Sequence, residues 1–180
     1  RVARPWVGLR RTQPGKERVA TMTTRSEMGT AHMKQGPGST KDVLEELVAT
    51  DLDAQRGFGR AAELIDDDGL ASRFRSMAAE RGRMASELLN AGARHGVEDR
   101  DRGTAGGALR RAWMTLKDEV VDDDRAILAT IAKAENEALE TYTQALRADL
   151  PDDVDGLVRR QFAEVKSAHD AVVDLRDARA

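Results

Sequence analysis

Four segments of the chain carry apolar residues at alternating steps of three and four, and this spacing constrains the fold more than any other feature. Such steps keep side chains on one face of an α-helix, whereas a strand would place them at every second position. Each segment is long enough for about five or six helical turns. The apolar stripes run from Leu44 to Ile65, from Leu70 to Leu88, from Leu128 to Ala145 or Leu146, and from Val154 to Leu175. We therefore expect four long helices that bury these stripes against one another.

Short turns join the four predicted helices in pairs. The first turn is the run 66–69, three aspartates and a glycine, and the second lies around Pro151. Turns this short make each pair an antiparallel hairpin. A connection of about 25 residues, with its own amphipathic segment at 109–120, separates the hairpins. One long crossover between two hairpins is the ferritin-like connectivity, so we predict an all-α, ferritin-like four-helix bundle over residues 40–180 with a short helix in the crossover.

Composition supports helices and excludes several kinds of site. Aromatic residues make up only 3 % of the chain and charged residues 34 %, which is typical of long helices around an aliphatic core. Because the chain has no cysteine, disulfides, thiolate metal sites and cysteine nucleophiles are excluded. The sequence also has no glycine-rich phosphate loop, dinucleotide fingerprint or recognisable nucleophile–base motif, so nothing in it indicates a hydrolase or a transferase.

Residues 1–39 differ from the rest of the chain. They hold three of the four prolines, and seven basic side chains against one acid in residues 1–25, so residues 26–180 carry a net charge of −9. We expect a disordered basic arm. It is either an artefact of the assigned start, since Met22, Met28 and Met33 are alternative starts, or an arm that contacts an anionic surface. The acidic body argues against nucleic-acid binding. The lack of a long apolar run argues against membrane insertion and predicts a cytoplasmic protein.

Several short motifs, taken in order, resemble a bacterial ferritin-like family known as domain of unknown function 2383. The resemblance covers residues 42–177 and implies the four-helix fold, but no established activity. It rests on Asp51, Gly57-Phe58, Ala61-Ala62-Glu63, Glu80-Arg81, Glu87-Leu88, Gly107-Ala108-Leu109, Ala112-Trp113-Met114, Ala134-Glu135-Asn136, Tyr142, Gln161 and His169-Asp170.

Polar residues interrupt the apolar stripes at one level of the predicted bundle. Asp51 and Arg81 lie 16 and 14 residues from Asp67 in the first turn. Counted from the second turn, Glu135 lies 15 residues before Leu150, and Gln161 lies 11 residues after it. His169, 19 residues after Leu150, lies at the border of its stripe. At 1.5 Å per residue, these positions fall within about one or two turns of a common height. We therefore predict a polar layer at mid-bundle.

Two interpretations explain how the charges of this layer are neutralised. In the first, Arg81 neutralises Asp51 and Glu135 through its planar set of donors, while Gln161 and His169 complete the hydrogen bonds. The layer is then a structural ion-pair network that fixes the register of the helices. This interpretation needs Arg81 to be buried against both acids.

In the second interpretation, the layer binds iron as ferritin-like di-iron proteins do. Those sites take a Glu from each of two helices and Glu-x-x-His from each of the other two. This chain has Arg83 where the motif wants His, and Lys166 where it wants Glu. The candidate ligands are Asp51, Glu80, Glu135, Glu164 and His169. This interpretation needs Arg81 to turn away from the acids.

The first interpretation predicts a non-enzymatic protein without a cofactor. Such a bundle acts through its packing or through contacts with a protein partner or a second copy, and its ferritin-like relatives suggest a role in stress. The alternative is an iron-dependent oxidoreductase or iron-handling protein with a degenerate carboxylate site. The sequence does not identify a partner.

Overall fold

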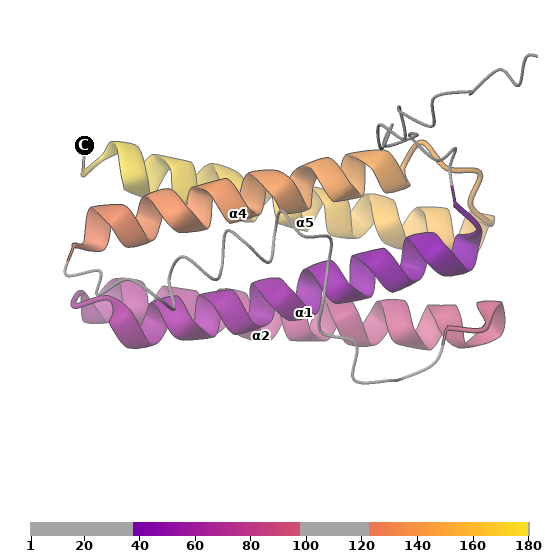
Figure 1. Ribbon diagram of the computed structural model, residues 1–180, viewed down its shortest axis with the longest axis horizontal. Helices are drawn as coiled ribbons and strands as arrows, with labels where there is room; N and C mark the ends of the chain where they lie inside the picture. The colour runs from indigo at the N-terminus through magenta and orange to yellow at the C-terminus, as the bar shows by residue number, and fades with distance from the viewer. Residues whose placement is uncertain (1–37, 98–122, 180) are drawn as a thin grey trace, which may run out of the picture. The chain divides into compact units, whose positions relative to one another are not determined.

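The described part of the protein, residues 38–97 and 123–179 of a computed structural model, consists of four long α-helices and one short helix (Figure 1). The long helices are α1 (Thr40–Leu64), α2 (Asp68–Gly92), α4 (Asp124–Ala145) and α5 (Asp152–Asp177). The 3₁₀ turn η1 (Ala93–His95) follows α2. Strands are absent from these two ranges. The prediction of an all-α four-helix bundle is confirmed.

The helices pack as two antiparallel hairpins. Figure 1 shows α1 beside α2 and α4 beside α5, with all four helices running along the long axis. The hairpins meet mainly through α1 and α4, while the other neighbouring pair across the hairpins, α2 and α5, packs less closely. An open groove of about 600 Å³ therefore lies between α2 and α5. It is lined by Arg73, Met77, Glu80, Arg160, Ala163, Glu164, Ser167, Ala168 and Ala171.

Side-chain caps explain where three of the helices begin. Ser39 caps α1: its hydroxyl accepts from the Asp42 N–H, and the Asp42 carboxylate accepts from the Ser39 N–H. Asp67 caps α2 by accepting from the Leu70 N–H, and Asp123 caps α4 by accepting from the Arg125 N–H. Asp67 and Asp123, each followed by a further aspartate at the start of its helix, thus act as helix caps.

The core has two apolar clusters, one toward each end of the bundle. The cluster next to the α1–α2 turn contains Phe58 and Phe74, whose ring centroids are 6.0 Å apart. The other cluster surrounds Leu47, Leu88 and Tyr142. Almost every predicted stripe residue is buried; Met77, Ala168 and Leu175 are only partly buried. On α1, α2 and α4, Asp51, Arg81 and Glu135 lie between residues of the two clusters, whereas Gln161 on α5 lies among residues of the second.

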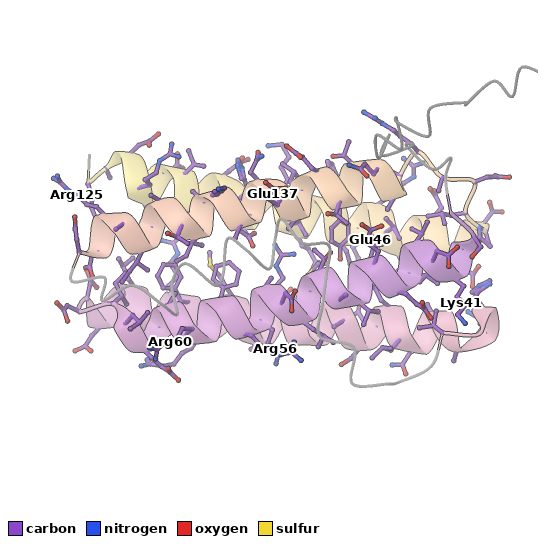
Figure 2. The ribbon with its side chains drawn as sticks, in the orientation of Figure 1. Lys41, Glu46, Arg56, Arg60, Arg125 and Glu137 are labelled. Atoms are coloured by element: carbon purple, nitrogen blue, oxygen red, sulfur yellow. The ribbon has the colours of Figure 1, made fainter. Side chains whose placement is uncertain are left out.

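Charged side chains cover the outside of the bundle. Figure 2 shows Arg56 and Arg60 on the side of α1 opposite to α4 and α5, and both are exposed. This distribution is that expected for helices with one apolar face. Of the helices described, none is long and apolar enough to cross a membrane.

Some predictions fall outside the described residues. Residues 1–37 hold nearly all of the predicted basic arm, and residues 98–122 hold the predicted crossover helix with Trp113 and Met114.

Candidate functional site

Arg81 is buried in the middle of the bundle between two carboxylates. Its side chain is 2 % exposed, and Nη1 lies 2.9 Å from Oδ1 of Asp51. Its Nη2 lies 2.5 Å from Oε2 of Glu135, a side chain that is 1 % exposed. One guanidinium on α2 therefore joins a carboxylate on α1 to a carboxylate on α4. The planar set of donors of arginine suits such a double contact, which the single ammonium of lysine would not make in the same way.

The local sequence explains why these three charges meet. Each occupies a position where the spacing of its helix calls for an apolar residue, so each must point into the bundle. Gly82, next to Arg81, faces α1 at this contact: a Cβ at this position would lie 2.9 Å from Nε2 of Gln55, an exposed and flexible side chain that could move aside. The charges are thus part of the helix contact itself.

Tyr142 and Gln161 extend the layer to α5. The Tyr142 hydroxyl lies 2.6 Å from Oδ2 of Asp51 and 3.1 Å from Oε1 of Gln161. Because a hydroxyl has one proton, it donates to the carboxylate, the stronger acceptor. The Gln161 amide donates to the Met84 carbonyl oxygen at 3.1 Å. We call Asp51, Arg81, Glu135, Tyr142 and Gln161 the buried layer; all four long helices contribute to it.

Burial changes the acidity of every ionisable group in the layer. It raises the pKa of Asp51 to about 6, although the charge of Arg81 and the Tyr142 hydrogen bond oppose the shift. Burial also raises the pKa of Glu135, against the charge of Arg81. For Arg81 itself, burial would lower the pKa, but the charges of Glu135 and Asp51 outweigh it and raise the pKa. The buried layer therefore holds a permanent cation between two acids that ionise reluctantly.

The family of the chain can be identified from its sequence. The family model for the domain of unknown function 2383 matches residues 39–148. The chain belongs to this family. The matched range includes Asp51, Arg81, Glu135 and Tyr142, and it ends before α5 begins. A comparison with curated proteins finds no match.

A second arginine organises a different network on the surface of this domain of unknown function 2383 protein. Arg83 is 41 % exposed and contacts Glu80 and Glu164, each at 2.5 Å, as well as Glu87. Arg160 joins the network through Glu87 at 2.8 Å. We call these five residues the surface network. It links α2 to α5 beside the open groove.

The five candidate iron ligands are divided between these two places. Asp51 and Glu135 are bound to Arg81 inside the bundle, whereas Glu80 and Glu164 are bound to Arg83 outside it. In the described ranges, no three His, Cys, Asp or Glu side chains come close enough together to hold a metal ion. The residues of this family member therefore do not fit a di-iron centre, because guanidinium groups occupy the positions beside the carboxylates that metal ions would take.

His169 is not hydrogen-bonded to the layer in which the sequence placed it. Its side chain is 20 % exposed, and Nδ1 lies 3.1 Å from Oδ1 of Asp170. Position 169 is eight residues beyond Gln161, which rotates it by about 80° around α5. Its charge still acts on Glu135, whose pKa it lowers slightly against the larger effect of burial.

Sequence reasoning missed two features of this site. Tyr142 was expected only as an apolar stripe residue, yet its hydroxyl completes the hydrogen bonds of Asp51. Its position two turns beyond Glu135 on the same stripe was the available signal, because a buried tyrosine needs a polar partner. No sequence pattern indicates the surface network, because its members lie outside the apolar stripes.

Proposed function

We propose that this protein is a non-enzymatic, ferritin-like helical bundle of the bacterial cytoplasm, in which the buried layer fixes the register of the four helices. The supporting observation is that Arg81 lies between Asp51 and Glu135, with all three side chains at most 2 % exposed. At this exposure the layer is closed to solvent, so a substrate could reach it only by displacing the packed helices. Its role is therefore structural: it holds the four helices in a fixed register.

The register role follows from the cost of separating these charges. Sliding one helix by a turn would move a charge by about 5.4 Å, into one of the apolar clusters. An unpaired charge buried there costs several kcal/mol, so the aligned arrangement is strongly favoured. Apolar contacts between leucine and alanine faces are much less selective for register.

The biological output of such a bundle lies on its surface. We propose that it acts through contacts with a protein partner or with a second copy, in a stress-related setting. The charged exterior and the open groove between α2 and α5 are the surfaces available for these contacts. The oligomeric state follows directly from light scattering on the purified protein.

The register proposal is tested by replacing all three charges at once, as Asp51→Leu, Arg81→Met and Glu135→Leu. Replacing a buried ion network by apolar residues often leaves stability unchanged or increases it. We expect the triple variant to stay helical and to lose the dispersed amide spectrum of a single packing arrangement. A triple variant with one well-dispersed set of signals would show that the layer is not needed to define the register.

The competing iron-dependent function is tested by metal content. The protein is loaded with Fe²⁺ without oxygen, desalted, and measured by inductively coupled plasma mass spectrometry. We expect no stoichiometric iron. Retention of about two irons per chain, the number in a di-iron centre, would overturn the proposal. The Arg81→Met variant is measured in parallel, because it removes the cation that would repel the metal.

A further inference from the structure

The buried layer contains more negative than positive charge if all of its groups ionise. Asp51 and Glu135 supply two carboxylates and Arg81 one guanidinium, while Tyr142 and Gln161 are neutral. The resulting net charge of −1 would lie in a region where each ionic side chain is at most 2 % exposed. Burying one uncompensated charge is costly, and carboxyl groups in that situation usually take up a proton instead.

The surroundings of the two carboxyl groups do not stabilise a negative charge equally. Both oxygens of Asp51 accept hydrogen bonds, Oδ1 from Arg81 and Oδ2 from the Tyr142 hydroxyl. In Glu135, Oε2 accepts from Arg81, but Oε1 is buried without a hydrogen-bond partner among the described residues. Hydrogen bonds stabilise the ionised form of a carboxyl group, so Glu135 is the member that ionises less readily.

Among the other described groups around Glu135, only His169 contributes positive charge, and burial outweighs its effect. On α1 its neighbour is Asp51, on α2 Arg81, and on its own helix the neutral Tyr142. On α5, Gln161 is neutral. His169, 20 % exposed, lies beside Asp170, and it lowers the pKa of Glu135 by less than burial raises it. Glu164, also on α5, adds negative charge near the layer, although Arg83 pairs with it.

We propose that Glu135 is a neutral carboxylic acid in the native protein at neutral pH, with its proton on Oε1. The layer then consists of one Arg81–Asp51 ion pair and one neutral acid whose Oε2 accepts from Arg81. The raised pKa of Glu135 agrees with this assignment. The layer is consequently a proton-binding site, and raising the pH until Glu135 ionises introduces a buried charge at the centre of the bundle. The inference builds on the proposed structural role of the layer, but that role stands even if Glu135 proves to be ionised.

The direct test is the ionisation state of Glu135 in the folded wild-type protein. Carbon-13 NMR of the assigned Glu135 carboxyl carbon is followed from pH 5 to pH 9. We expect the chemical shift of a protonated acid at pH 7, with ionisation only at higher pH. The shift of a carboxylate throughout the range from pH 6 to pH 9 would overturn the proposal. This measurement needs no variant, so it does not depend on how a substitution folds.

A second test uses proton linkage to unfolding. If Glu135 keeps its proton in the folded state and loses it on unfolding, the unfolding equilibrium constant rises about tenfold per pH unit between pH 6 and pH 7 through this group alone. We expect Glu135→Gln to remove that contribution, and Glu80→Gln, the matched change in the surface network, to leave it intact. An equal pH dependence in the wild type and in Glu135→Gln would contradict the assignment.

Discussion

Arg81 and Arg83 are two residues apart on α2, and both bind carboxylates from more than one helix. The pKa values of their carboxylate partners nevertheless shift in opposite directions. Arg81 is 2 % exposed and lies between two acids whose pKa values are raised by burial. Arg83 is 41 % exposed, and among its partners the pKa of Glu80 is lowered, chiefly by the hydrogen bond from Arg83. The pKa of Glu87 is also lowered, because hydrogen bonds from Arg160 and Arg83 outweigh its partial burial.

The comparison shows that exposure to solvent, more than the number of partners, decides how much an ion pair contributes to stability. In the buried layer, each charge depends on its partner because water is excluded. In the surface network, water and salt already stabilise the charges, so each contact adds little. Four predictions test this difference.

The largest effect is expected from removing the buried cation. Arg81→Met leaves Asp51 and Glu135 buried without their cation and should lower the free energy of unfolding by about 3–5 kcal/mol. Urea denaturation at pH 7 followed by circular dichroism measures the loss. A loss below about 1 kcal/mol would show that Arg81 contributes no more to stability than the exposed Arg83, and would contradict the difference between the buried layer and the surface network.

A smaller effect is expected from removing the Tyr142 hydroxyl. Tyr142→Phe keeps the ring and so leaves no large cavity, but Asp51 loses a hydrogen bond inside the layer. The expected cost is about 2 kcal/mol, typical of a buried hydrogen bond to a charged group. Ser86→Ala, which removes an exposed hydroxyl bonded to the Gly82 carbonyl oxygen, is the control and should change stability little. Equal losses in the two variants would show that the layer does not depend on this hydroxyl.

The pH dependence of Asp51 should have the sign opposite to that of the surface acids. Its folded pKa of about 6 is higher than its unfolded value, so the native state takes up the proton first as the pH falls. Relative to Asp51→Asn, the wild type should gain about 1–2 kcal/mol of stability between pH 7.5 and pH 5. Glu80 and Glu87 have lowered pKa values, so their contribution is lost only as the pH falls below about 4.5. Parallel curves for the two proteins above pH 5 would contradict this assignment.

The smallest effect is expected at Arg83. Arg83→Met breaks the surface network but should lower the free energy of unfolding by less than about 1 kcal/mol. Because the network is half-exposed, the difference from wild type should shrink further in 1 M salt. A loss as large as that of Arg81→Met, or one insensitive to salt, would mean that the network is effectively buried.

The same pair of arginines shows how much the sequence could predict. The stripe positions of Asp51, Arg81, Glu135 and Gln161 placed these residues inside the bundle, because helical periodicity fixes which face points inward. Periodicity does not fix hydrogen-bond partners, which depend on side-chain rotamers and on how closely the helices approach. For that reason the sequence does not indicate the role of Tyr142, and it places His169 in the layer although its partly exposed side chain is hydrogen-bonded to Asp170 instead. The surface network depends on contacts across the loosely packed α2–α5 pair, for which the stripes carry no signal.

The position of Asp51, Arg81 and Glu135 between the two apolar clusters also affects how the bundle opens. Each cluster is continuous within itself, but these three side chains separate the two along α1, α2 and α4 at mid-length. When one end of the bundle frays, the opening therefore reaches these polar side chains before it reaches the other apolar cluster. Polar side chains become hydrated when water reaches them, whereas apolar side chains do not. Amide hydrogen exchange should consequently report two partly independent half-bundles, whose cooperativity depends on the few hydrogen bonds that connect Asp51, Arg81, Glu135, Tyr142 and Gln161.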